Sequence, residues 1–309
     1  MVIRIFSMDH LMKALNTAGL ILFAALLAGS AQSQELTGTL KKIKDSGTIT
    51  LGARESSAPF SYSLGGTQFV GFSVDLMMKV VDRIKSELKM PELKYTIIPF
   101  TAQNRIPLIQ NGTLDFECSS TTNTPERQQQ VSFSTSFFVI GTRLLTAKDS
   151  GIKDFVDLKG KNMSTTAGTT SERLINKYNE DKNMGMNVMA ARENTQSFLA
   201  VDSGRAVAFM MDDAILFGER AKSKNPEKWI VVGTPMSREA YGCMMRKDDA
   251  PFKKLVDSTL TDLMKSGEIN KLYTKWFEEP IPPRNTSLAF PQSDDIKALY
   301  ANPNDQAIQ

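Results

Sequence analysis

The stretch ECSSTTNTPER at residues 117–127 says most about the fold of this chain. A short apolar strand is expected at 113–116, and Thr124 followed by Pro125 then predicts the start of a helix, with Thr124 as its N-cap. Arg127 lies in the first turn of that helix. Hydroxyls, free backbone N–H groups and a guanidinium therefore meet at one strand end, which suits them to bind a carboxylate. The alternative is a capped helix with Arg127 in a surface ion pair.

Strands and helices alternate along the rest of the chain in the same way. Ser73 is the expected N-cap of one helix, and Thr169 with Glu172 predicts a capping box at the start of another. The alternation predicts an α/β fold with mostly parallel sheets flanked by helices, and with ligands bound at the carboxyl ends of the strands. The strands are expected near 49–52, 94–99, 161–165, 186–190, 206–211 and 229–233, and the helices near 73–88, 103–110, 169–178, 195–203, 251–265 and 267–277.

Two longer extended segments, at 134–146 and 239–246, are candidates for two crossings between two lobes. The first lobe would then be discontinuous, because the chain leaves it, builds the second lobe and returns. We expect the first lobe to comprise residues 32–138 and 243–309, and the second lobe residues 139–242. Two lobes joined by two hinge strands can close around a ligand.

The first 31 residues predict a signal peptide. Arg4 and Lys13 give it a positive start, an apolar run follows at 18–28, and a small-residue cleavage site ends at Ala31. The apolar run is too short to span a bilayer, and it is not followed by the cysteine that a lipid anchor would need. About 278 residues remain. We expect them to be exported to a bacterial periplasm as a soluble protein.

Composition excludes several classes of function. The formal net charge of the whole chain is +3, and it falls by one when Arg4, Lys13 and Asp9 of the predicted signal peptide are removed. Such a small net charge argues against nucleic acid or an anionic membrane as a partner. The only histidine, His10, lies in the predicted signal peptide. The mature chain therefore lacks Ser-His or Cys-His catalysis and histidine-based zinc sites. It also lacks a calcium loop and a phosphate-binding loop. We expect no enzyme activity, catalytic residue, metal or cofactor.

Cys118 and Cys243 are the only two cysteines. Export to an oxidising compartment favours a disulfide between them. Two buried, reduced thiols are the alternative, because both residues lie in apolar, strand-like sequence.

From about Leu40 to its C-terminus the chain resembles the bacterial periplasmic glutamate/aspartate-binding proteins, which are solute receptors of ABC importers. The resemblance implies a type II periplasmic binding protein fold, an amino-acid ligand, membrane permease subunits as partners, and a monomer. It rests on the motifs RESS at 54–57, QNRIP at 103–107, STTN at 120–123, GTTS at 168–171 and SGRAVAFMMDD at 203–213.

The resemblance implies a role for Arg127 that agrees with the chemistry of its sequence neighbours. Arg127 would grip the α-carboxylate of the ligand, assisted by the N–H and hydroxyl of Thr122. Thr170, with Ser171 as a helper, would meet the same carboxylate from a helix N-terminus in the second lobe when the lobes close.

Other residues would bind the rest of the ligand. Asp212 would pair with the α-ammonium group, and Ser120 would contribute an oxygen. Arg54 and Arg105 match the two arginines that receive the side-chain carboxylate. Three arginines and one aspartate give a site charge of about +2, which suits a ligand with a net charge of −1.

Two positions depart from the family pattern. Ala102 stands where the family has a serine, and Asn194 stands where it has a histidine that contacts the ligand. An asparagine amide can donate to a carboxylate, but it can also accept a hydrogen bond from an amide.

A receptor that prefers glutamine, asparagine or another polar amino acid is therefore an alternative. A periplasmic dehydratase on the same scaffold is a second alternative, with Glu55 or Glu117 as its base. The sensor domain of a membrane protein is a third, although no second membrane segment is predicted.

Overall fold

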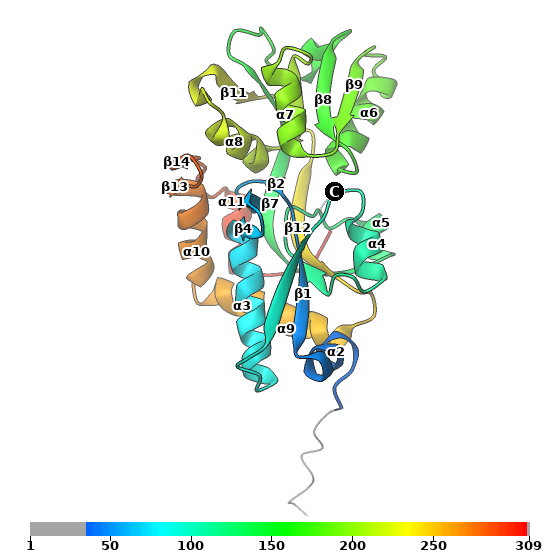
Figure 1. Cartoon of the computed structure of the whole chain (residues 1–309). Helices are drawn as coiled ribbons and strands as arrows, with labels where there is room; N and C mark the ends of the chain where they lie inside the picture. Colours follow the sequence, from blue (N-terminus) through cyan, green and yellow to red (C-terminus); the bar gives the residue numbers. More distant parts are fainter. Residues whose placement is uncertain (1–34, 308–309) are drawn as a thin grey trace, which may run out of the picture. The chain divides into compact units, whose positions relative to one another are not determined.

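The computed structural model describes residues 35–307, so the predicted signal peptide lies outside the described residues. Of these, residues 37–307 belong to one compact unit. Its main sheet has nine strands in the order β5-β1-β6-β12-β7-β10-β8-β9, with β11 also paired to β7 (Figure 1). The bounds of these strands are β1 Thr48–Ala53, β5 Lys94–Pro99, β6 Phe116–Glu117, β7 Ser132–Ala147, β8 Asn162–Thr166, β9 Asn187–Ala191, β10 Ala208–Asp212, β11 Trp229–Val232 and β12 Arg238–Met245.

The long strands β7 and β12 join the two halves of this sheet. The first part of β7, residues 132–141, pairs antiparallel with β12. β12 also pairs with β6. The second half of β7 pairs instead with β10 and β11. Pairing is parallel between β1 and β5, between β1 and β6, and between β8 and β9. The predicted α/β fold with two lobes and two hinge strands is therefore confirmed.

We call the part built on β1, β5 and β6 the first lobe, and the part built on β8, β9, β10 and β11 the second lobe. The expected lobe boundaries, after residues 138 and 242, fall inside the two hinge strands, and this division stays a proposal. Two small sheets accompany the main one. They consist of β2 Ser56–Ser57, β3 Ser61–Gly65 and β4 Gln68–Val70, and of β13 Pro280–Ile281 and β14 Thr286–Ser287.

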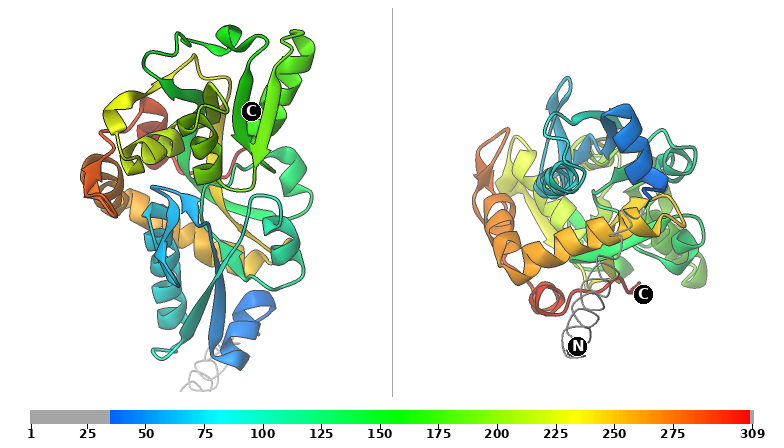
Figure 2. Two further views of the ribbon diagram at one scale, coloured as in Figure 1. Left: turned by 45° about the horizontal axis from the view of Figure 1, so that its top comes forward. Right: turned by 90° about the horizontal axis from the view of Figure 1, so that it is seen from below.

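Helices of the first lobe come from both ends of the described chain. α9 packs against α2, α3 and β7, so a helix from the C-terminal part of the chain packs against helices from the N-terminal part (Figures 1 and 2). These helices are α2 Gly38–Ser46, α3 Phe72–Glu87, α4 Arg105–Gln110, α5 Pro125–Gln128, α9 Ala250–Lys265, α10 Glu268–Tyr273 and α11 Asp294–Ala301.

The second lobe has its own helices and its own apolar core. α6 Thr170–Asp181, α7 Asn194–Asp202 and α8 Asp213–Lys222 pack against its strands. Its core gathers side chains from β7, β8, β10 and the segment before β8, including Leu144, Phe155, Met163 and Met210. The single-turn helices at Phe155–Leu158, Pro226–Lys228 and Thr274–Glu278 complete the described helical elements.

Local helix signals were right at two predicted N-caps and wrong at one. Thr124 and Thr169 each accept a hydrogen bond from the backbone N–H three residues later. The second half of the predicted capping box differs, because Glu172 accepts from the N–H of Gly168, 2.7 Å away. Ser73 is not the N-cap of α3. That helix begins at Phe72, because backbone carbonyls of an earlier loop accept the first N–H groups of the helix.

The hinge strands are fixed by aromatic packing and by a disulfide. Phe138 on β7 and Tyr241 on β12 lie nearly parallel, with ring centroids 6.3 Å apart, and both contact Phe60. Cys118 and Cys243 form the predicted disulfide, which ties the loop after β6 to β12.

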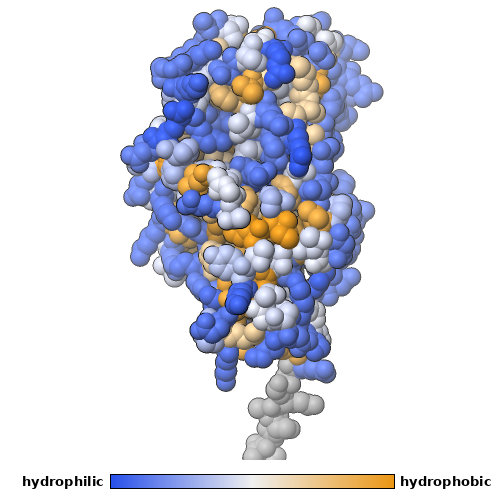
Figure 3. Space-filling view, viewed as in Figure 1, coloured by the Kyte–Doolittle hydropathy of each residue, from blue (hydrophilic) through white to orange (hydrophobic). Residues whose placement is uncertain are grey.

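Hydrophilic residues predominate on the face shown in Figure 3, with hydrophobic residues gathered near its middle. Among residues 35–307 no helix is both long and apolar enough to cross a membrane.

Candidate functional site

Arg127 lies where the two lobes meet. Thr124 caps the short helix α5, which places Arg127 in the first turn as predicted. Its Nη1 donates to the carbonyl of Thr122, 2.9 Å away, and its Nη2 lies 3.4 Å from the carbonyl of Gly168 in the second lobe. Burial lowers the pKa of Arg127, and the carboxylates of Glu239 and Asp212 act against that shift. The segment 117–127 of the first lobe therefore reaches across to the GTTS motif of the second lobe.

Arg54 and Arg105 are almost completely buried, with relative exposures of 1% and 2%. Arg105 donates from Nη1 to the hydroxyl of Thr121 at 3.0 Å. Burial lowers the pKa of Arg105 well below its usual value, and the charges of Arg127 and Arg54 add to this effect. Arg105 is therefore close enough to be repelled by both other predicted arginines, which favours an anionic group near it.

Three buried glutamates lie at the site, and of these only Glu117 belongs to a segment that the sequence placed there. Glu117 accepts from the hydroxyls of Ser119 and Thr121 at 2.7 and 2.6 Å, and burial raises its pKa. Glu193 forms an ion pair with Arg54, with 3.0 Å between Oε2 and Nη2.

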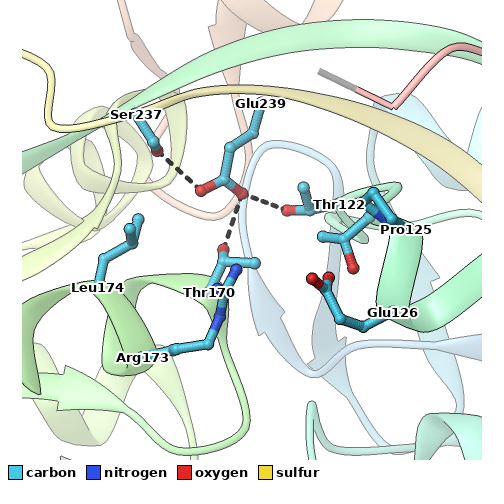
Figure 4. A pocket seen from close by; sticks show the side chains of 9 residues that line it. Thr122, Pro125, Glu126, Thr170, Arg173, Leu174, Ser237 and Glu239 are labelled. Carbon is cyan, nitrogen blue, oxygen red and sulfur yellow. Dashed lines mark hydrogen bonds between the residues drawn. The ribbon is translucent and has the colours of Figure 1, made fainter. Parts of the chain in front are cut away.

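Glu239 is the third of these glutamates, and it lies on hinge strand β12. Its Oε2 accepts from Thr122 in the first lobe at 2.5 Å and from Thr170 in the second lobe at 2.7 Å. Figure 4 shows these two hydroxyls meeting at the same carboxylate, with Ser237 on its other oxygen. Glu239 thus bonds two of the groups assigned to the α-carboxylate of the ligand.

The expected site charge of about +2 is therefore wrong. Four carboxylates, not one, lie among the three guanidiniums: Glu117, Glu193, Asp212 and Glu239. Two of the extra residues adjoined predicted features, since Glu193 precedes Asn194 and Glu239 opens the segment 239–246. Neither could be placed at the site from local sequence, because Arg54 lies 139 residues from Glu193, and Thr170 and Thr122 lie 69 and 117 residues from Glu239.

Asp212 ends strand β10 and precedes α8, and its side chain is buried. It accepts hydrogen bonds from the hydroxyls of Tyr241 and Ser171, the latter at 3.3 Å. Burial and the charge of Glu239 raise the pKa of Asp212, while the hydrogen bonds from Tyr241 and Ser171 lower it, so that it lies at about 8. An ammonium group placed here would favour the ionised form of Asp212.

Asn194 is fully buried at the start of α7 and bonds both lobes to each other. Its Nδ2 lies 3.2 Å from the carbonyl of Ser56 and 3.1 Å from the hydroxyl of Ser57, both in the first lobe. Its Oδ1 accepts from Thr166 in the second lobe at 2.7 Å. Both amide hydrogens of Asn194 are thus engaged by protein oxygens.

Ser120 and Ala102 are buried in first-lobe loops next to the site. Ala102 lies against Gly168. A Cβ added to Gly168 would lie 3.0 Å from the carbonyl carbon of Ala102 and 2.9 Å from the backbone nitrogen of Gln103. Gly168 also has a φ of +77°. This close approach explains why the GTTS motif begins with glycine.

A cavity of about 220 Å³ opens beside Thr122 and Thr170. Arg173 and Glu126 reach into it from α6 and α5, on opposite sides (Figure 4). Within residues 35–307 no cluster of three or more histidine, cysteine or acidic side chains could hold a metal ion.

Two lobes with opposing arginine, hydroxyl and carboxylate groups define a solute-binding protein. Residues 49–279 match the model of the bacterial extracellular solute-binding proteins, family 3, and the chain belongs to this family.

Its relatives and structural neighbours agree with this family. The chain is 58% identical over 289 residues to the L-glutamate/L-aspartate-binding protein of Pseudomonas aeruginosa, covering 93% of this chain and 95% of the relative. It is 52% identical over 301 residues to the glutamate/aspartate import solute-binding protein of Escherichia coli, covering 96% of this chain and all of the relative. A solved mutant of ArgBP from T. maritima has a TM-score of 0.69 and 30% identity, covering 78% of this chain and 99% of the other.

Proposed function

We propose that this protein is a periplasmic receptor that captures glutamate or aspartate by lobe closure and delivers it, as a monomer, to the permease of an ABC importer. One observation carries the proposal: Arg54, Arg105 and Arg127 of the first lobe converge opposite Thr170 and Asp212 of the second. Three guanidiniums can hold two carboxylates, and Asp212 can hold one ammonium group.

The proposed roles follow the positions of these groups. Arg127, Thr122 and the N-terminus of α6 at Thr170 and Ser171 bind the α-carboxylate. Asp212 and Ser120 bind the α-ammonium group. The buried pair Arg54 and Arg105 binds the side-chain carboxylate, and Asn194 keeps the lobes in register around it. The printed names of the two relatives above, which refer to glutamate and aspartate, support this ligand class.

The magnitudes are sufficient for tight binding. Each charge-assisted hydrogen bond contributes about 1.5–3 kcal/mol net. Five or six such bonds supply the ~8 kcal/mol that micromolar affinity requires, after ordering of the ligand and closure of the lobes are subtracted.

We further propose that the protein has no enzyme activity. One structural neighbour, with a TM-score of 0.66 and 30% identity, is an ancestral amino acid-binding protein described as a precursor of cyclohexadienyl dehydratase. The two candidate bases of such an enzyme are poorly placed here. Glu55 is exposed, and Glu117 has a hydrogen bond from a hydroxyl on each carboxylate oxygen. Ligand recovered chemically unchanged after prolonged incubation, as followed by NMR, would agree with a receptor.

A thermal-shift and calorimetry panel on refolded, ligand-stripped protein tests the proposal. Glutamate or aspartate at a hundredfold over its dissociation constant should stabilise the fold by about 2.7 kcal/mol. Arginine and alanine serve as controls that should stabilise the fold less at the same concentration, since neither has a side-chain acceptor for Arg54 and Arg105. Absence of stabilisation by both acidic amino acids would refute the proposal.

A further inference from the structure

The distal part of the site, around Arg54 and Arg105, contains buried polar atoms without partners. Four buried side-chain nitrogen and oxygen atoms in residues 35–307 lack a hydrogen-bond partner. Three of them are Arg54 Nε, Arg105 Nε and Glu193 Oε1. The fourth, Ser136 Oγ, lies on hinge strand β7. A buried polar atom without a partner is costly, so three at one site point to groups that a ligand supplies.

The second lobe contributes Glu193, and its position is fixed. Glu193 precedes α7, and its backbone N–H donates to the side chain of Gln196 at 3.3 Å. Its Oε2 accepts from Arg54 Nη2 at 3.0 Å and from the hydroxyl of Ser56 at 2.6 Å. Both bonds use the same oxygen, so Oε1 is left as an acceptor beside the guanidinium of Arg54.

The unpaired atoms are two donors and one acceptor. A carboxylate of the ligand can satisfy the Nε atoms of Arg54 and Arg105, but it has no hydrogen for Glu193 Oε1 and is repelled by it. A carboxamide satisfies all three, because its oxygen accepts from the arginines and its NH₂ group donates to Glu193.

We propose that Glu193 is a specificity-determining residue through which the distal subsite binds carboxamide side chains, those of glutamine and asparagine, in addition to carboxylates. This inference rests on the proposed function, since it concerns the same amino-acid site.

The charges around the distal subsite nearly balance, which suits a ligand whose side chain is neutral. Glu193 is paired with Arg54, and the carboxylate of Glu117 acts on the pKa of Arg105 in the direction opposite to burial. Two arginines are thus accompanied by two glutamates. A carboxamide entering this subsite does not leave an excess positive charge buried without compensation.

Titration calorimetry on ligand-stripped wild type, with glutamate and glutamine as separate ligands, tests the inference. We expect dissociation constants that differ by no more than about tenfold. Glutamate binding without measurable glutamine binding would overturn the inference and leave the proposed function intact. Absence of glutamate binding would refute the proposed function itself.

The variant Glu193→Gln provides the second arm. Its side-chain oxygen must still accept from Arg54 and Ser56, so its NH₂ group takes the place of Oε1 and faces the ligand as a donor. The ratio of glutamate to glutamine affinity should rise at least tenfold. If Glu193 had a merely structural role, the variant would lose affinity for both ligands equally. An unchanged affinity ratio would therefore overturn the inference. Ser56→Ala is the matched control, because it removes a bond to Oε2 and leaves Oε1 in place, so it should keep the wild-type ratio.

Discussion

Tyr241 on hinge strand β12 donates its hydroxyl hydrogen to Asp212 at the end of β10 in the second lobe. Both side chains are fully buried. The ring of Tyr241 is held by Phe60 and Phe138, so the hydroxyl has a fixed position. The residue proposed to bind the ligand's ammonium group is thereby bonded directly to the hinge.

The stability of the ligand-free protein should fall as pH rises, in part because of Asp212. Its pKa is raised from 3.8 to about 8 by burial. Between those values the native state keeps a proton that the unfolded chain has lost, so the free energy of unfolding decreases with rising pH. Urea denaturation at pH 5, 6, 7 and 8 measures this slope. Asp212→Asn should show a shallower decrease, and equal slopes would contradict the assigned pKa.

Removal of the Tyr241 hydroxyl should weaken amino-acid binding. The hydrogen bond from Tyr241 lowers the pKa of Asp212, so Tyr241→Phe should raise that pKa further. Ionising Asp212 for the ligand's ammonium group then costs more, and a bond to a charged group contributes about 1.5–3 kcal/mol. We expect about a tenfold loss of affinity at pH 7, with the loss decreasing at higher pH. A pH-independent loss would indicate a packing effect instead.

The three arginines should differ in what their removal does. Arg127→Ala should abolish binding of every amino acid, because the α-carboxylate is common to all of them. Arg54→Ala and Arg105→Ala should chiefly lose affinity for ligands with a polar side chain. Calorimetry with glutamate, aspartate and alanine separates these outcomes. Equal losses for every ligand in the latter two variants would refute the assigned roles.

A methyl group at Gly168 should hinder closure of the lobes. Its Cβ would lie 2.8 Å from Gln103 Cγ and 2.9 Å from the Gln103 nitrogen, in the opposite lobe. We expect Gly168→Ala to lower ligand affinity at least tenfold. Gly151→Ala is the matched control, because Gly151 has nearly the same φ, +76°, but nothing within 4 Å of the added Cβ. Similar affinity losses in both variants would show that backbone strain alone is responsible.

Loss of the disulfide should reduce stability more than affinity. Cys118 and Cys243 are 125 residues apart in sequence, so the bond closes a long loop in the unfolded chain. Replacing both with serine should lower the free energy of unfolding by about 2–5 kcal/mol. Urea denaturation of the variant and wild type checks this. An unreduced wild-type mass equal to the reduced mass would contradict the bond itself.

Local sequence was a sound guide where the chemistry is local. Thr124 caps α5 and Asp212 ends β10 because each signal depends on neighbours within a few residues. Ser73 failed as an N-cap because carbonyls of Pro59 and Phe60, remote in sequence, accept the first N–H groups of α3.

The sequence by itself determined the alternating α/β pattern, the two hinge segments and the residue types of an amino-acid clamp, because periodicity and capping are local properties. Only the tertiary structure decided the electrostatics of the site. It brought Glu193 to Arg54 across 139 residues, and Glu239 to both Thr122 and Thr170. The strength of charge interactions depends on distance and burial, which the folded arrangement of the strands sets.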